Sequence, residues 1–202
     1  LEKTPEQFLD EIVKQYKQLW KLLNISYDDF IRTTEPRHKN AVEKFIKKIF
    51  ETGDIYKGNY EGLYCVPCET FFTELQAPEK KCPDCDRKVK PVKEEAYFFK
   101  LSKFQKPLLE FYKNNPNFLA PKKRSKEIIN RVKSGLKDLC ITRATVSWGI
   151  PFPEDKKHTI YVWVEALQNY ITALGYPNGK NFKTFWPADV HLVGKEINWF
   201  HS

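Results

Sequence analysis

Two pairs of cysteines, Cys65 with Cys68 and Cys82 with Cys85, constrain the fold of this chain more than any other feature. Each pair has the spacing Cys-x-x-Cys, and thirteen residues separate the pairs, which is close to the spacing of four-cysteine zinc sites. Two tight turns that each offer two thiolates can surround one zinc ion as a tetrahedron. We therefore predict a structural zinc site with Cys65, Cys68, Cys82 and Cys85 as ligands, in a small module of short strands and turns.

Other uses of these cysteines are less favoured. The chain has no run of eighteen apolar residues and no signal-peptide core at its start, so we expect neither a membrane span nor secretion, but a cytoplasmic location where disulfides are rare. A thioredoxin-like redox motif is disfavoured because neither pair follows a strand and opens a helix. A catalytic zinc is disfavoured because four thiolates leave no position for water. The fifth cysteine, Cys140, is expected to be a buried thiol.

Helical patterns precede and follow the cysteine module. The segment Thr4 to Gln7 has the pattern of a capping box, and apolar residues at helical spacing then predict an amphipathic helix over residues 5–23. A second helix is predicted from Pro36 to a stop at Gly53. After the module we expect helices near residues 103–113 and 125–137, and a strand-like segment over 139–145.

The last forty residues indicate an α/β protein. A helix over about 162–174, closed by Gly175, would place Trp163, Ala166 and Tyr170 on one face. The apolar run 189–193, followed by Gly194 and a helical pattern, predicts a strand, a tight turn and a helix. Because such a unit needs neighbouring strands, and because the sequence lacks an initiator methionine, we expect it to be an internal part of a larger protein.

The charge leaves two interpretations open. Lys and Arg number 34 against 26 Asp and Glu, a formal charge of +8, and the densest basic run lies at 122–126. Such a run is typical of a solvated surface, but it could also attract a phosphate backbone. Basic charge, aromatic residues and four paired cysteines together would also suit a zinc-ribbon module that binds nucleic acid without catalysis. The residues considered one by one do not decide between these alternatives.

Three segments read together carry a resemblance to a known family. They are 60–72 (YEGLYCVPCETFF), 161–166 (YVWVEA) and 191–201 (HLVGKEINWFH). In this order they resemble methionyl-tRNA synthetases, a family of class I aminoacyl-tRNA synthetases, and the resemblance extends over essentially the whole chain. It implies a Rossmann-type α/β catalytic domain split by an inserted α+β connective-peptide module with a zinc knuckle. Residues 1–55 would then end the first Rossmann half, 56–138 would be the insertion and 139–202 would start the second half.

The resemblance also implies the site residues. Trp163, Ala166 and Tyr170 match positions that line the methionine side-chain pocket, and a polarizable thioether suits such aromatic contacts. Ile197 and His201 match further pocket residues on a second element. Arg143 and Glu196 match two further positions, which the resemblance places in the catalytic cleft close to the nucleotide. At the position of Glu196, many members of the family have Asp.

The implied activity is that of a methionine–tRNA ligase. Such an enzyme activates methionine with ATP and Mg²⁺, and then transfers the methionyl group to tRNA(Met) during translation. The two class I signatures, His-Ile-Gly-His and Lys-Met-Ser-Lys-Ser, do not occur in these 202 residues. The resemblance places them before and after this stretch, so we expect the 202 residues alone to be inactive. The sequence does not indicate an oligomeric state.

Overall fold

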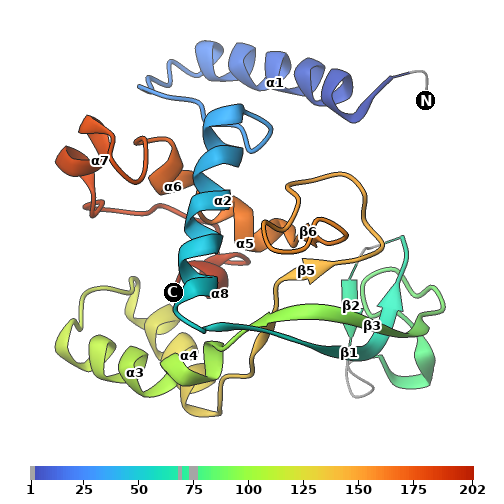
Figure 1. Cartoon of the computed structure of the whole chain (residues 1–202). Coiled ribbons are helices and arrows are strands. Elements are labelled where there is room, and N and C mark those ends of the chain that lie inside the picture. The colour runs from blue at the N-terminus through green and yellow to red at the C-terminus, as the bar shows by residue number, and fades with distance from the viewer. Residues whose placement is uncertain (1–2, 68–69, 73–76) are drawn as a thin grey trace. The chain divides into compact units, whose positions relative to one another are not determined.

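The computed structural model describes residues 3–67, 70–72 and 77–202, and these residues form two compact units (Figure 1). The first unit consists of Leu1–Val42 and Gln168–Asp189, and the second of Glu43–Leu167 and Val190–Ser202. Within the described residues, no helix is both long and apolar enough to cross a lipid bilayer. The first unit holds helices and loops, and the strands of the described residues all lie in the second unit, so the predicted mixture of helix and sheet is confirmed for the described residues.

Helix α1 (Pro5–Leu22) begins at the predicted capping box. The Thr4 hydroxyl accepts a hydrogen bond from the backbone N–H of Gln7 at 3.3 Å, and the Gln7 side-chain oxygen accepts one from the N–H of Thr4 at 3.0 Å. The predicted second helix is α2 (Pro36–Glu51), and Gly53 follows it with a φ of +74°, which ends the helix as expected. Local signals therefore fix both helices to within a residue or two.

The rest of the first unit consists of loops, α6 (Asn169–Thr172) and α7 (Lys180–Phe185). The loop after α1 is held by an aromatic cluster in which the rings of Tyr27 and Phe30 each lie 5.0 Å from Trp20. The Nδ1 atom of His38, in α2, lies 2.8 Å from the hydroxyl of Thr172, in α6. This hydrogen bond between two fully buried side chains satisfies polar groups that would otherwise be costly to bury.

A four-stranded antiparallel sheet forms the centre of the second unit, with the order β2-β1-β3-β4. Its two long strands are β1 (Ile55–Cys65) and β3 (Lys90–Phe99), and its short strands are β2 (Thr70–Phe72) and β4 (Leu139–Cys140). A separate antiparallel pair consists of β5 (Thr142–Arg143) and β6 (Thr159–Ile160). The predicted short strands of the cysteine module are therefore wrong for β1 and β3, which run for 11 and 10 residues.

A helical hairpin extends from this sheet. The 3₁₀ helix η2 (Leu101–Phe104) leads into α3 (Gln105–Asn114), and α4 (Lys122–Lys133) packs against α3 around a small core of Tyr112, Ile128 and Val132. The predicted helices are confirmed, but α4 begins three residues earlier and ends four residues earlier than expected. Pro121 directly precedes its first turn, and Gly135 has a φ of +114° just beyond its end. A second 3₁₀ turn, η1 (Pro78–Lys80), lies beside the cysteines.

Two predictions about the last forty residues are wrong. The single helix predicted over 162–174 is divided into α5 (Val162–Ala166) and α6 by Leu167 and Gln168, whose ψ angles of −19° and −7° are shallower than the usual helical value. Residues 189–193 form no strand, and the Leu192 side chain is 96% exposed. A strand needs a neighbour to pair its backbone groups, and no strand among the described residues pairs with this segment. The short helix α8 (Asn198–His201) does follow.

Candidate substrate pocket and metal centre

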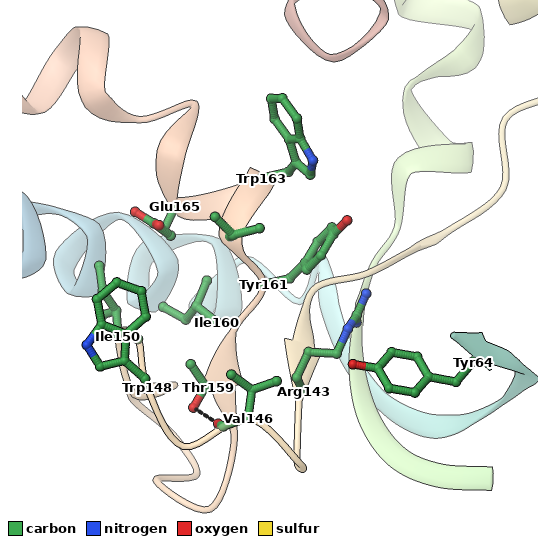
Figure 2. Close-up of a pocket in the computed structure, with 12 residues that line it drawn as sticks. Tyr64, Arg143, Val146, Trp148, Ile150, Thr159, Ile160, Tyr161, Trp163 and Glu165 are labelled. Carbon is green, nitrogen blue, oxygen red and sulfur yellow. Dashed lines mark hydrogen bonds between the residues drawn. The ribbon is translucent and has the colours of Figure 1, made fainter. Parts of the chain in front are cut away.

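A pocket of about 400 Å³ opens in the second unit beside β5, β6 and α5 (Figure 2). This volume is in the range of small-molecule sites in proteins. The side chains around it are mostly aromatic and aliphatic, with one cation and one carboxylate. The lining residues are Tyr64, Arg143, Val146, Trp148, Gly149, Ile150, Thr159, Ile160, Tyr161, Val162, Trp163 and Glu165.

Arg143, predicted for the catalytic cleft, provides the cation. It is only 8% exposed, and its guanidinium lies 4.1 Å from the ring centroid of Tyr161, as Figure 2 shows. The same guanidinium donates a hydrogen bond to the carbonyl oxygen of Thr142 at 2.8 Å and contacts the sulfur of Cys140 at 3.3 Å. These contacts hold a permanent positive charge in a fixed orientation at the wall of the pocket.

Glu94, Tyr60 and Cys140 are ionisable residues of the four-stranded sheet that interact electrostatically with Arg143. Glu94 of β3 stands opposite Tyr60 of β1, and neither of its carboxylate oxygens has solvent contact or a hydrogen-bond partner within the described residues. Burial raises the pKa of Glu94, although the charges of Arg143 and His158 partly oppose this effect. Burial likewise raises the pKa values of Tyr60 and Cys140. The charge of Arg143 therefore acts in a poorly solvated environment.

Trp163, predicted for the methionine pocket, also lines the pocket. Its ring stacks on Phe200 of α8 with a centroid distance of 4.3 Å and an interplanar angle of 4°. Two other predicted residues lie at this helix, where the Nδ1 atom of His201 is 2.9 Å from the carbonyl oxygen of Ile197. Ile197 and His201 do not themselves line the pocket. Trp163 and α8 nonetheless belong to the same unit and are joined by the ring stack.

The remaining predicted residues are more scattered. Ala166 ends α5 in the second unit, whereas Tyr170 lies in α6 of the first unit, where burial raises its pKa. Leu167 and Gln168 separate α5 from α6 in the sequence, and the placement of Tyr170 at the methionine pocket stays a prediction. The side chain of Glu196 is 72% exposed and lies 3.5 Å from the amino group of Lys195. Of the predicted pocket and cleft residues, Arg143 and Trp163 are the ones that line the described pocket.

Several lining residues were not predicted from the sequence, among them Tyr64, Trp148 and Tyr161. The glycine at position 149 is the one local sequence feature that relates to this wall of the pocket. Its φ of +146° is one that L-residues rarely take. A Cβ atom on Gly149 would lie 2.5 Å from the Cγ2 atom of Thr159, so the backbone approaches the opposite strand closely here. A glycine after a tryptophan in a loop thus marks this wall of the pocket.

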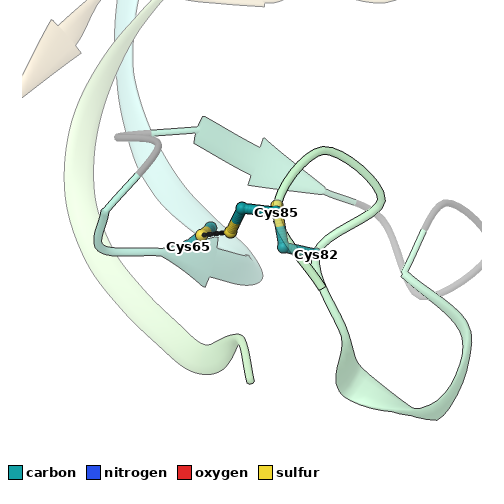
Figure 3. A group of neighbouring side chains, drawn as sticks. All are labelled: Cys65, Cys82 and Cys85. Atoms are coloured by element: carbon teal, nitrogen blue, oxygen red, sulfur yellow. Dashed lines mark hydrogen bonds between the residues drawn. The ribbon is translucent and has the colours of Figure 1, made fainter. Parts of the chain in front are cut away.

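Three of the four predicted zinc ligands come together at the end of β1. Figure 3 shows Cys65, the last residue of β1, facing Cys82 and Cys85, which lie on the segment between η1 and β3. The sulfur atoms of all three lie within 4.8 Å of one another, and those of Cys65 and Cys85 are 3.5 Å apart, too far for a disulfide. Cys65 and Cys82 are buried among Leu63, Phe72 and Val89. The predicted fourth ligand, Cys68, lies outside the described residues.

Comparison with known proteins identifies the family. The family model for class I tRNA synthetases (M) matches residues 1–91 and 85–202, so the chain belongs to the class I tRNA synthetases. The similar curated proteins are named methionine–tRNA ligases. Those of Caldanaerobacter subterraneus and Clostridium acetobutylicum are 55% and 54% identical to this chain, and each comparison covers 98% of it. The chain spans about a third of the length of these relatives, 32% and 31% respectively.

Solved structures give the same result. The methionyl-tRNA synthetase of Mycobacterium tuberculosis in complex with methionyl-adenylate is 40% identical, with a TM-score of 0.84 over 92% of this chain and 38% of that one. The free form of the same enzyme gives a TM-score of 0.86 at 39% identity, over 98% of this chain and 41% of that one. The class I synthetase fold is therefore supported, and the resemblance seen in the sequence is confirmed.

Proposed function

We propose that these 202 residues are part of the catalytic region of a methionine–tRNA ligase, which activates methionine with ATP and transfers it to tRNA(Met). The observation that carries this proposal is the pocket that Arg143 and Trp163 both line, since the sequence resemblance matches both residues to the family's site. The proposed segments are 1–55 and 139–202, from the two Rossmann halves, and 56–138, from the insertion between them.

In this proposal the pocket side chains recognise the methionine thioether by contact with aromatic rings. Sulfur makes favourable contacts with aromatic edges and faces, and Trp163 with Tyr161 and Trp148 offers three such rings. Ala166, Tyr170, Ile197 and His201 complete the proposed methionine site. Arg143 supplies a fixed positive charge for the carboxylate or phosphate that reacts nearby, and Glu196 is proposed to stand close to the nucleotide.

ATP with Mg²⁺ is the proposed second substrate, and its phosphates need groups beyond these residues. The sequence contains no methionine, so it lacks the Lys-Met-Ser-Lys-Ser signature, and it also lacks His-Ile-Gly-His. Because such reactions depend mainly on positioning and on charge stabilisation, the 202 residues alone should not form the adenylate. The full-length protein is the proposed enzyme, and the cytoplasm is its proposed location.

A structural zinc ion at the cysteines is also part of the proposal. Zn–S bonds of about 2.3 Å in a tetrahedron separate the sulfur atoms by about 3.8 Å. The 3.5 Å between Cys65 and Cys85 is close to that length, and the buried sulfur of Cys82 lies within 4.8 Å of both. Cys65, Cys68, Cys82 and Cys85 would hold the ion and fix the turns of this module.

The proposed function is tested by amino-acid-dependent exchange of pyrophosphate into ATP, measured on the zinc-loaded full-length protein with each of the twenty amino acids. A signal with methionine alone is expected. Exchange with a different amino acid would refute the proposed specificity. Silence with all twenty, combined with salt-dependent and sequence-indifferent RNA binding, would favour a zinc-ribbon module without catalysis.

A further inference from the structure

Helix α8 is a single turn; two of its side chains contact other parts of the second unit, and a third contacts the residue that precedes the helix. Trp199 packs against the core of the α3–α4 hairpin formed by Tyr112, Ile128 and Val132. The next residue, Phe200, stacks on Trp163 at the pocket. The residue after that, His201, returns to the carbonyl oxygen of Ile197. Successive residues of a helix point about 100° apart, so one turn is enough to reach all three directions.

The position of α8 must be set from outside the helix. A helix of four residues cannot form stably on its own, because helices shorter than about 12–15 residues are marginal in water. The segment before it, residues 190–194, belongs to no helix or strand. Packed contacts with neighbouring elements therefore decide where Phe200 and His201 point.

One of these contacts is made by the hairpin. The guanidinium carbon of Arg131, in the last turn of α4, lies 3.9 Å from the ring centroid of Trp199. A planar guanidinium can lie flat on an indole and combines cation–π attraction with stacking, which a lysine cannot match. Trp199 is thus held between the apolar core of the α3–α4 hairpin and the guanidinium of Arg131 on α4.

We propose that Arg131 and Trp199 are positioning residues, through which the α3–α4 hairpin fixes α8 and thereby the Phe200–Trp163 stack at the substrate pocket. This inference rests on the proposed function, since it assigns the hairpin a part in methionine binding. Neither residue lines the pocket, so neither touches the substrate. Without the Arg131–Trp199 contact, α8 should rotate more freely about its own axis. Methionine should then bind more weakly, while the affinity for ATP changes little.

The test uses the full-length protein with Arg131→Met, which keeps an aliphatic stem but removes the guanidinium. Lys133→Met is the matched control, because Lys133 is exposed two residues further along the same helix. Methionine affinity is measured by calorimetry, and KM values for methionine and ATP by pyrophosphate exchange. Because Arg131 is exposed, we expect Arg131→Met to raise the methionine Kd and KM by about two- to fivefold, in keeping with cation–π energies at exposed sites. The KM for ATP and the response of the control should stay near wild type.

Two further variants separate positioning from simple loss of structure. Arg131→Lys should recover part of the methionine affinity, because it restores the cation, and Trp199→Phe should be milder than Trp199→Leu, because it keeps a ring. The inference is overturned if Arg131→Met behaves like Lys133→Met, or if the variant loses affinity for methionine and ATP equally. Absence of methionine-dependent exchange in the wild-type protein would instead refute the proposed function, and this inference with it.

Discussion

Replacement of Gly149 by alanine probes the close approach that shapes one wall of the pocket. The added Cβ atom would lie 2.5 Å from the Cγ2 atom of Thr159, and the φ of +146° is one that an alanine rarely adopts. Thr159 cannot easily turn away, because its hydroxyl donates a hydrogen bond to the carbonyl oxygen of Val146 at 2.6 Å and its χ1 angle is restricted by branching. Both backbone strain and overpacking are therefore expected.

The two costs can be separated by experiment. Backbone strain of this kind costs about 1–3 kcal/mol, and an overpacked methyl group about 1–3 kcal/mol more, so Gly149→Ala should lower the free energy of unfolding by about 2–6 kcal/mol. Thr159→Ser removes the methyl group and keeps the hydroxyl, so the double variant should regain the overpacking cost only. Urea denaturation followed by circular dichroism measures all four proteins of this cycle.

Two results would show that Gly149 is not required at this wall of the pocket, or not because of Thr159. A Gly149→Ala variant within about 0.5 kcal/mol of wild type, the usual range for harmless surface substitutions, would mean that the loop adjusts freely. A double variant no more stable than Gly149→Ala would mean that Thr159 is not the obstacle.

Three further predictions concern the metal, the pocket and the buried acid. Cys82→Ser should reduce bound zinc from about one ion per chain to almost none after dialysis, as measured by atomic absorption, whereas Cys140→Ser should retain it; equal zinc in both variants would exclude Cys82 as a ligand. Trp163→Ala should raise the KM for methionine by about tenfold or more in pyrophosphate exchange, with little change for ATP, and an unchanged methionine KM would remove Trp163 from the site. Burial raises the pKa of Glu94, so the folded protein holds the proton of this carboxyl more tightly than the unfolded chain does, and folding becomes less favourable as the pH rises through the folded pKa. Glu94→Gln should therefore raise the melting temperature at pH 8 but not at pH 4. A rise at pH 4 but not at pH 8 would disprove the raised pKa of Glu94.

Local features of the fold were predictable because their causes are local. The capping box at Thr4 and the glycine stop at Gly53 depend only on neighbouring residues, and α1 and α2 begin and end close to where these signals lie. The helix predicted over 162–174 failed because periodicity cannot reveal a change of ψ at Leu167 and Gln168. The strand predicted over 189–193 failed because a strand is defined by its partner, which apolar patterning does not contain.

The candidate site likewise contains some residues that can be predicted from the sequence and others that cannot. Arg143 and Trp163 were found through the family resemblance, and the cysteines through their spacing, whose chemistry is encoded within a few residues. Tyr64 and Trp148 were missed because they come from segments about eighty residues apart, which meet only after the β1–β3 sheet and the β5–β6 pair have formed.

The central claim is that the pocket beside Trp163 and Arg143 receives methionine, and a crystal structure of the full-length protein with bound methionine tests it most directly. We expect the thioether sulfur at about 5 Å from an aromatic ring of the pocket, with Trp163 in contact with the side chain. Methionine bound elsewhere, with no atom touching Trp163, would show that this pocket is not the methionine site.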